Sequence, residues 1–273
     1  MAVTMADITH LRKMTGAGMM DCKNALNEAQ GDFDKAMEII RKKGQAVAAK
    51  RSDREASEGC VLAKCDGEYA ALVALKCETD FVAKNADFIA LTQQILDLAV
   101  ANRCKSMDEV KALPLGNVTV EVAVTDRSGI TGEKMELDGF AFVEGKQTVA
   151  YIHPGNKLAS IVALNQPVDV QVAKDVAMQV AAMSPLAVTP EGVDPEVIKR
   201  ELEIAADKAR QEGKPENMIE KIAQGRLNKF YKEVCLLQQE YIKDAKLSIA
   251  AYLQQQNKDL TVTDFKRFTL NQE

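Results

Sequence analysis

Tryptophan is absent from this chain, histidine occurs only twice, and aromatic residues make up 5% of its 273 residues. Positive charge is also in short supply, because 35 Lys and Arg stand against 40 Asp and Glu, for a formal net charge of -5. Proteins that bind nucleic acid need a basic surface, and those that bind single strands usually add aromatic side chains on which bases stack. The composition therefore argues against a nucleic-acid partner and favours a protein partner.

The six cysteines show neither a CxxC pair nor the dense spacing of a disulfide-stapled secreted domain. Cys60, Cys65 and Cys77 could be considered as three metal ligands, but they lie in apolar, strand-like segments, where a free cysteine usually behaves as a small hydrophobic residue. Neither His10 nor His153 has a partner residue at the spacing of a metal site or a catalytic triad. We expect no metal, no cofactor and no catalytic residue, so an enzyme is the least favoured class.

Long apolar runs are missing as well. No such run approaches the length of about 20 residues that spans a bilayer. The first ten residues lack the basic cluster and apolar stretch of a targeting signal, and Asp7 stands where a transit peptide would be rich in arginine. Together with the cysteine pattern, these absences predict a cytoplasmic protein that does not contact a membrane.

Two glycine-containing segments fall short of phosphate-binding motifs. Residues 139–147 contain Gly145-Lys146, but the first glycine of a phosphate loop is missing and Gln147 lacks the hydroxyl that binds magnesium. At Gly16-Ala17-Gly18, Asp21 stands where a dinucleotide fingerprint needs its third glycine. We interpret the first segment as a turn between strands and expect no direct nucleotide binding.

The chain is longer than a usual single domain, so two or three domains are expected. Over residues 1–43 apolar residues recur at helical spacing, interrupted by Gly16-Ala17-Gly18 and by Gly31-Asp32, which predicts three short helices. Residues 44–57 are small and charged, and their basic residues are interpreted as a solvated linker rather than a nucleic-acid contact. The first predicted domain is therefore a helical module with its linker, residues 1–54.

From Gly59 onwards the sequence favours strands. Residues 60–65 and 68–77 flank the hairpin turn signal Asp66-Gly67, and a helical pattern follows over residues 82–101. The same order recurs, with a candidate hairpin and a helix at residues 149–153, 158–164 and 170–183. This repeat predicts a duplicated α+β unit, divided into subdomains at residues 55–138 and 139–273, with coincidence as the alternative because the matching segments are short.

A predicted helical hairpin at residues 194–232, with its turn at Gly213-Lys214-Pro215, interrupts the second unit. It is either an antiparallel arm that projects from the domain or a pair of core helices. The flanks 234–237 and 260–268 look like strands, which favours the arm. Elsewhere, valines alternate with other residues over 118–124, which indicates a strand.

One loop holds residues that are hard to explain as structure alone. Thr79-Asp80-Phe81-Val82 joins a predicted strand to a predicted helix. Phe81 could fold back onto the helix as a hydrophobic staple, or it could be an exposed aromatic side chain presented by a rigid scaffold. At this level the two alternatives are equal.

Motifs found in order along nearly the whole chain resemble the elongation factor Ts family. The two most specific are Thr15-Gly16-Ala17-Gly18-Met19-Met20-Asp21-Cys22-Lys23, similar to the family's amino-terminal signature, and Thr79-Asp80-Phe81-Val82-Ala83-Lys84, similar to its second signature. Further matches are Gly132-Glu133, Tyr151-Ile152-His153-Pro154-Gly155, Gly213-Lys214-Pro215 and Gly225-Arg226-Leu227-Asn228-Lys229-Phe230.

The resemblance implies an α+β fold, in which a three-helix module similar to ubiquitin-associated domains precedes two related α+β subdomains with antiparallel sheets. An antiparallel, coiled-coil-like helical hairpin interrupts the second subdomain, and a helix replaces the strand that the valines at 118–124 indicate. The implied function is that of a guanine-nucleotide exchange factor, which binds the GTPase elongation factor Tu and promotes GDP release during translation. A non-catalytic adaptor or chaperone-like scaffold for a GTPase is the alternative.

The resemblance also implies a set of contacts with elongation factor Tu. Phe81 would insert into the GTPase domain near the magnesium and phosphate site, with Asp80 as its polar neighbour, and His153 would face the third domain of the partner. The complete set is Arg12, Met19, Met20, Thr79, Asp80, Phe81, Val82, Gly132 and His153. Self-association through the helical hairpin is left open.

Two departures from the family pattern limit what is carried over. The chain ends at Glu273, so contacts made by a carboxy-terminal helix in some members are not transferred. Thr131 stands before Gly132 where an aliphatic residue is common, and the valines before it have weak helix propensity. These two features make the contact implied at Gly132 the least securely transferred from the family pattern.

Overall fold

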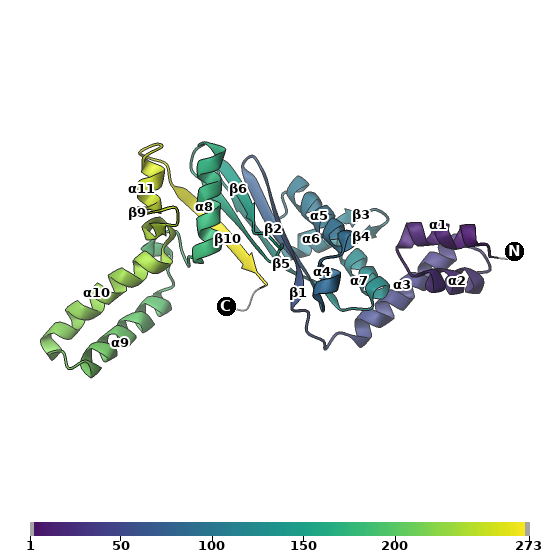
Figure 1. The fold of residues 1–273 in the computed structure, drawn as a ribbon, viewed down its shortest axis with the longest axis horizontal. Coiled ribbons are helices and arrows are strands. Elements are labelled where there is room, and N and C mark those ends of the chain that lie inside the picture. The colour runs from purple at the N-terminus through teal and green to yellow at the C-terminus, as the bar shows by residue number, and fades with distance from the viewer. Residues whose placement is uncertain (1–2, 271–273) are drawn as a thin grey trace.

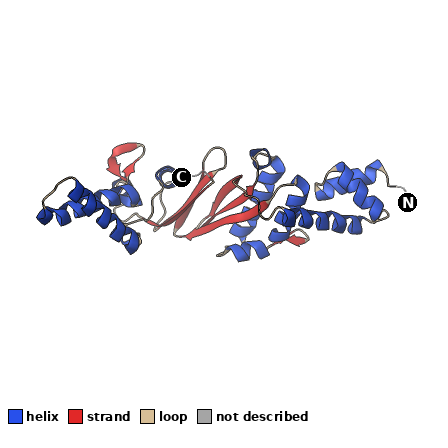
Figure 2. Ribbon diagram, turned by 90° about the horizontal axis from the view of Figure 1, so that it is seen from below, coloured by secondary structure: helices blue, strands red, loops and turns tan. Residues whose placement is uncertain are grey.

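The computed structural model describes residues 3–270 and shows an elongated molecule, with helices at both ends and two small sheets between them (Figures 1 and 2). Its helices are α1 (Met5–Thr15), α2 (Met19–Glu28), α3 (Phe33–Lys50), α4 (Asp80–Ala83), α5 (Ala86–Ala101), α6 (Met107–Ala112), α7 (Val120–Thr131), α8 (Val170–Met183), α9 (Pro195–Gln211), α10 (Glu216–Val234) and α11 (Ile249–Gln254). Its strands are β1 (Glu58–Asp66), β2 (Tyr69–Cys77), β3 (Pro114–Leu115), β4 (Val118–Thr119), β5 (Met135–Glu144), β6 (Gln147–Ile152), β7 (Leu158–Leu164), β8 (Glu240–Tyr241), β9 (Asp244–Ser248) and β10 (Val262–Thr269).

The first three helices form a small module at one end of the molecule, as predicted (Figure 1). Its core is built from residues such as Leu11, Cys22 and Leu26, which are completely buried. Asp32 caps α3, because its carboxylate accepts a hydrogen bond from the Lys35 backbone N–H at 3.1 Å. The core is small, so the position of the module depends on what α3 contacts beyond it.

The interpretation of residues 44–57 as a linker is wrong for its first half. Helix α3 continues to Lys50, and it packs against α7 of the core. Gly44 and Gly129 make the crossing possible, because a Cβ on Gly129 would lie 2.1 Å from the Gly44 Cα. The helix contacts its neighbour with backbone rather than with large apolar side chains, and hydrophobic periodicity therefore did not reveal the contact.

Two three-stranded antiparallel sheets form the centre, in the orders β1-β2-β5 and β10-β7-β6. In each sheet one strand of a hairpin is central, and a third strand joins it after a helical insertion. The predicted pair of related α+β units is confirmed. The first hairpin turns at Gly67 and Glu68, one residue later than the signal suggested, because Asp66 pairs with Tyr69.

The sheets pack face to face, with α5 covering the outer face of the first and α8 covering the outer face of the second. Along β2, Val73 and Leu75 point to the core under α5, whereas Leu72 and Ala74 point to the core shared by the sheets. On β7, Ile161 enters the same shared core. Because both faces of β2 and β7 are covered, these strands are apolar throughout instead of alternating with polar residues.

Strand β5 connects the two sheets. It pairs with β2 along its length, and the boundary predicted between residues 138 and 139 therefore falls inside this strand. Gly145 and Lys146 then lead into β6 of the second sheet. The turn predicted within residues 139–147 is present at Gly145-Lys146, but residues 139–144 belong to β5. The proposed division into domains stays a prediction.

Two further predictions about helices need correction. The single helix expected over residues 82–101 is divided into α4 and α5. Asn85 lies between them and caps α5, because its side chain accepts a hydrogen bond from the Asp87 N–H at 2.8 Å. Of the strand indicated by the valines, only Val118 lies in one, the two-residue β4, and the stretch from Val120 onwards is α7, as the family resemblance implies. Val120 and Val124, four residues apart, are buried on one face of it, so tertiary packing overrides the local preference for strand.

Helices α9 and α10 pack side by side as an arm that projects from the sheets at the end opposite the module, which confirms the projecting interpretation (Figure 1). Of its two flanks, residues 260–268 contain β10, as predicted. The other flank, 234–237, is not a strand, because Val234 ends α10 and a 3-10 turn covers Leu236–Gln238. Cys235 and Leu236 are apolar there because they fill the core at the base of the arm.

A buried carboxylate anchors the segment that follows the arm. Asp175 of α8 accepts hydrogen bonds from the hydroxyls of Tyr241 and Tyr252, at 2.8 and 3.0 Å, and from the Lys243 ammonium at 2.7 Å. Burial opposes ionisation, but these bonds and one from Gln171 lower the pKa of Asp175 below its ordinary value. The segment that follows the arm is therefore tied to α8 by a charged group.

Candidate functional site

The loop between β2 and α5 presents one large aromatic side chain to solvent. Phe81 lies in the first turn of α4, and its side chain is 84% exposed. Behind it, Ala83 is buried and Val82 packs partly against the core under α5. Phe81 is therefore not a staple folded back onto the helix, and the alternative of an exposed aromatic on a scaffold is the correct one.

An ion pair lies next to Phe81 in the sequence. The Asp80 carboxylate accepts a hydrogen bond from the Lys84 ammonium at 2.7 Å. That hydrogen bond and the charge of Lys84 lower the pKa of Asp80, and the charge of Lys157 adds to the effect. Asp80 is thus a carboxylate at neutral pH, next to the exposed ring.

Two further carboxylates hold the loop from behind. Glu133 accepts hydrogen bonds from Thr79, and Glu78 accepts hydrogen bonds from Arg51 and Arg54 in the segment just after α3. The side chain of Glu78 is only 13% exposed. The interpretation of residues 44–57 as a solvated connector is therefore wrong for Arg51, which is paired with a largely buried acid, whereas Arg54 makes the same pairing from a position that is 58% exposed.

Gly132, predicted from the resemblance, lies beside this loop. It ends α7 in the left-handed conformation, with φ of 73°, and Glu133 follows it directly. The hydrogen bonds between Glu133 and Thr79 thus bring Gly132 close to residues 79–82. The structure places these five predicted positions in one region.

The predicted residues of the module lie apart from the loop. Arg12 is exposed near the end of α1, and Met20 is 64% exposed in the first turn of α2. Met19 is only partly accessible, because it packs against the small core of the module. The turn at Gly16 lies close to Arg127 and Ile130 of α7, which sets the module next to the first α+β unit.

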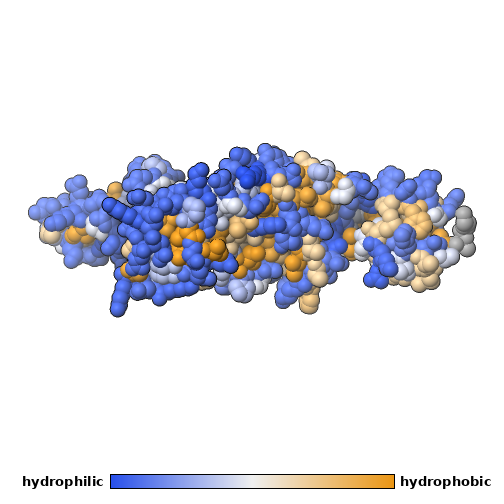
Figure 3. All heavy atoms as spheres, turned by 90° about the horizontal axis from the view of Figure 1, so that it is seen from above, coloured by the Kyte–Doolittle hydropathy of each residue, from blue (hydrophilic) through white to orange (hydrophobic). Residues whose placement is uncertain are grey.

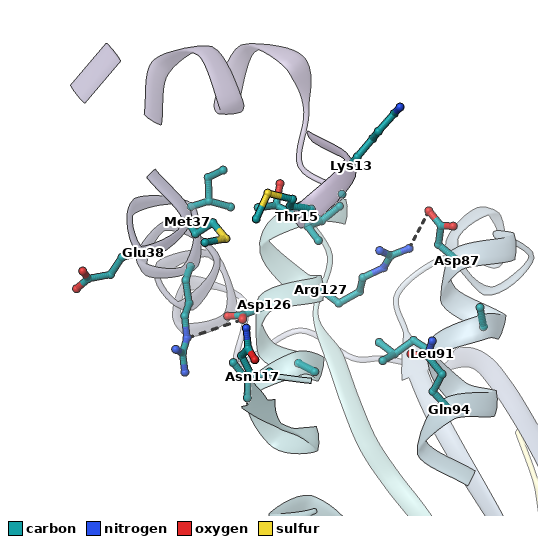
Figure 4. A pocket seen from close by; sticks show the side chains of 18 of the residues that line it. Lys13, Thr15, Met37, Glu38, Asp87, Leu91, Gln94, Asn117, Asp126 and Arg127 are labelled. Carbon is teal, nitrogen blue, oxygen red and sulfur yellow. Dashed lines mark ion pairs between the residues drawn. The ribbon is translucent and has the colours of Figure 1, made fainter. Parts of the chain in front are cut away.

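A cavity of about 750 Å³ lies between the module and this unit (Figure 4). On one side Arg127 forms an ion pair with Asp87 at 3.4 Å, and on the other Asp126 lies 3.8 Å from Arg41 of α3. Burial raises the pKa of Asp126, and Arg41 opposes this effect. The cavity is a seam of mixed polar and apolar residues between two packed units, crossed by ion pairs from α3 and α5 to α7.

His153 lies on the turn between β6 and β7, in the second unit. It is exposed, and its Nδ1 lies 3.0 Å from the Tyr151 hydroxyl oxygen. The same turn contacts the first sheet, because the Asn156 carbonyl accepts a hydrogen bond from the Val61 N–H at 2.7 Å. His153 therefore belongs to the second unit, but its turn also carries Lys157, whose charge acts on Asp80 of the loop around Phe81.

The surface view shows apolar residues gathered over the middle of the molecule, while the arm end is mainly hydrophilic (Figure 3). Within residues 3–270, no cluster of three or more potential metal ligands is present. None of the helices in this range combines the length and apolar character that a membrane span requires. Cys60 and Cys77 are buried core residues as predicted, but Cys65 is exposed.

Sequence reasoning did not assign roles to Glu78, Glu133 or Arg51. Glu133 was part of a short motif match, and its position directly after a helix-ending glycine was the available signal. Glu78 and Arg51 are separated by 27 residues and meet only through the fold. A charge pair of this kind has no local pattern in the sequence.

A family model described as elongation factor TS matches residues 78–272. The chain belongs to the elongation factor Ts family. The matched region begins at Glu78, just before the exposed loop, and includes β5, the whole second sheet and the arm.

Relatives in the elongation factor Ts family extend the match to the module. A protein named elongation factor Ts from Porphyromonas gingivalis is 60% identical over 272 residues, which cover 99% of each chain. Those from Bacteroides thetaiotaomicron and Azobacteroides pseudotrichonymphae are 56% and 51% identical, and each match covers 100% of both chains. The similarity therefore includes α1–α3 as well as the region that the family model matches.

Proposed function

We propose that the loop around Phe81 is the element through which this chain acts as a nucleotide exchange factor for elongation factor Tu. The observation that carries the proposal is an aromatic side chain, 84% exposed, on a short helix held from behind by hydrogen bonds. An exposed aromatic on a rigid support is the kind of residue that dominates protein interfaces. Its insertion into the GTPase domain would disturb the nucleotide site without any contact to GDP.

One aromatic side chain is not sufficient for this activity. Burial of a phenylalanine contributes roughly 1.5 to 3 kcal/mol, and a coupling of about 1 to 3 kcal/mol changes affinity by about 5 to 150-fold. Further contacts therefore act with it. The proposed set joins Arg12, Met19, Met20, Gly132 and His153 to residues 79–82, over the module and both α+β units.

An exchange factor changes how fast a nucleotide leaves its partner and makes or breaks no covalent bond. The chain is accordingly a non-enzymatic protein of translation elongation, which takes place in the cytoplasm of bacteria such as those of its relatives. Its partner is a protein. Self-association through α9 and α10 stays a prediction.

The exchange activity is tested with elongation factor Tu loaded with fluorescent GDP. The protein is added at a few per cent of the molar amount of the partner, and loss of fluorescence is followed in the presence of excess unlabelled GDP. We expect release to accelerate far beyond what that small amount could bind. Binding without acceleration would instead favour the alternative of a non-catalytic adaptor.

The role of the loop is tested with Phe81→Ala in the same assay. Because an exposed side chain contributes little to folding, we expect the thermal unfolding temperature to stay nearly unchanged. Exchange should slow by roughly tenfold or more, since a buried interface contact is lost. Leu186→Ala, which removes another apolar side chain that is 60% exposed, is the matched control and should leave exchange unchanged. A normal exchange rate for Phe81→Ala would refute the proposal.

A further inference from the structure

Helix α4 cannot orient Phe81 by itself. It has four residues, which is far below the length at which a helix is stable alone. Phe81 is 84% exposed as a residue, so its ring makes few contacts that could hold it. The direction in which the ring points must therefore be imposed on the backbone of the loop by other groups.

Glu133 is the group with the most contacts to that backbone. Its Oε2 accepts hydrogen bonds from the backbone N–H groups of Glu78 and Thr79, at 3.2 and 3.1 Å. Its Oε1 accepts a hydrogen bond from the Thr79 hydroxyl at 2.6 Å. The Thr79 hydroxyl oxygen in turn accepts from the Val82 N–H at 3.4 Å and so caps α4. A chain of hydrogen bonds thus runs from Glu133 through the cap residue to the turn that bears Phe81.

The loop that carries Glu78 also accepts a hydrogen bond from the loop that carries Glu133. The Glu78 carboxylate accepts a hydrogen bond from the Lys134 backbone N–H at 2.6 Å. It also accepts from the guanidinium groups of Arg51 and Arg54, at 2.9 and 3.1 Å. Each loop therefore contributes a carboxylate to the backbone of the other, and the end of α3 is attached to the same point.

We propose that Glu133 is a positioning residue for nucleotide exchange, whose carboxylate fixes the Thr79–Phe81 turn in the orientation that presents the aromatic ring to the partner. This inference rests on the proposed function of Phe81. Glu133 acts through its hydrogen bonds to Glu78 and Thr79, and not through a contact with the ring of Phe81. A turn held in place before binding loses less conformational freedom when the complex forms, so the benefit appears in the rate of exchange.

The test is a double-mutant cycle in the full chain, with catalysed GDP release as the readout. Glu133→Ala should lower the exchange rate by about tenfold, because three charge-assisted hydrogen bonds to the loop are lost. Glu133→Gln keeps one acceptor oxygen and should recover part of the rate. When Phe81 is already alanine, Glu133→Ala should cause no further loss, since there is no ring left to orient.

Glu136→Ala is the matched control. It removes a carboxylate three residues further along, which is exposed and pairs with Lys134 at 3.4 Å but has no contact with Thr79. This variant has the same change in net charge and should exchange at the normal rate. Amide hydrogen exchange should be faster at residues 79–83 in Glu133→Ala and unchanged in Glu136→Ala.

The outcomes separate this inference from the function on which it rests. Normal exchange by Glu133→Ala, together with slow exchange by Phe81→Ala, would refute the role of Glu133 and leave the role of Phe81 intact. Equal losses from Glu133→Ala with and without Phe81 would also refute it, because Glu133 would then act on the fold. Normal exchange by Phe81→Ala would overturn both. If Glu133→Ala loses its cooperative unfolding transition, the same cycle is run with Glu133→Gln.

Discussion

Glu78 has two functions at the level of the single residue. Its backbone donates to Glu133, and its carboxylate accepts from Arg51, Arg54 and the Lys134 N–H. Burial opposes ionisation of this carboxyl, but the hydrogen bonds lower the pKa of Glu78 from 4.5 to about 2. The ionised carboxylate of Glu78 is therefore stabilised in the folded protein relative to the unfolded chain.

This shift predicts a loss of stability in acid. A carboxyl whose pKa is depressed by folding contributes its full stabilisation above the unfolded pKa of about 4.5, and the contribution disappears as the pH falls towards 2. We expect the unfolding temperature of the protein to fall across this window. Glu78→Gln should be less stable at pH 5 but should show a smaller fall, measured by thermal unfolding at pH values from about 5 to 2. Parallel curves for the two proteins would contradict the assignment.

At the scale of secondary structure, the crossing of α3 and α7 determines where the module sits. The two helices approach so closely at Gly44 and Gly129 that no side chain fits between them. Helix α7 ends at Gly132, beside the loop that carries Phe81. Helix α7 therefore contacts the module through α3, and its carboxy-terminal end lies beside the loop that carries Phe81.

Gly129→Ala tests this arrangement. The added methyl group would overlap Gly44, so we expect a loss of about 1 to 3 kcal/mol in the free energy of unfolding and a slower exchange rate as the module shifts. Gly225→Ala in α10 is the matched control, because a Cβ there meets nothing within 4 Å. It should stabilise the protein by roughly 0.5 to 1 kcal/mol through its higher helix propensity. The outcome that would exclude a tight crossing is a similar gain in both variants.

At the scale of the whole molecule, the proposed contacts are spread over a body whose module and arm lie at opposite ends (Figure 1). The proposed positions belong to the module, the first unit and the second unit, so no single element supplies the interface. The weakening of GDP binding by this protein must be matched by an equal weakening of the protein's own binding by GDP. Each contact can therefore contribute to affinity for elongation factor Tu, to the coupling that weakens GDP binding, or to both.

Phe81→Ala separates these two roles. If the ring disturbs the nucleotide site, its removal should weaken binding to nucleotide-free elongation factor Tu by about tenfold more than binding to the GDP-bound form. Titration calorimetry with both forms of the partner measures this difference. Equal weakening of both would mean that Phe81 contributes affinity without coupling, and the exchange activity would then reside in the other contacts.

The sequence by itself determined the family, the three helices of the module and the two hairpins. Capping residues, turn glycines and hydrophobic spacing are local, so Asp32, Gly67 and the apolar run of β7 could be interpreted one segment at a time. The wrong predictions from the sequence arose where tertiary packing overrides a local pattern. The valines before Gly132 favour a strand locally, yet they form a helix because one face packs on the core.

Only the tertiary structure decided which way Phe81 points and what holds it there. Both alternatives for that side chain satisfy the same local pattern, and they differ only in the space around the loop. The pairings of Gly44 with Gly129, Glu78 with Arg51, and Glu133 with Thr79 join residues 27 or more positions apart. These contacts depend on two backbones that come close together or on charged groups that folding brings together. Neither leaves a periodic pattern in the sequence.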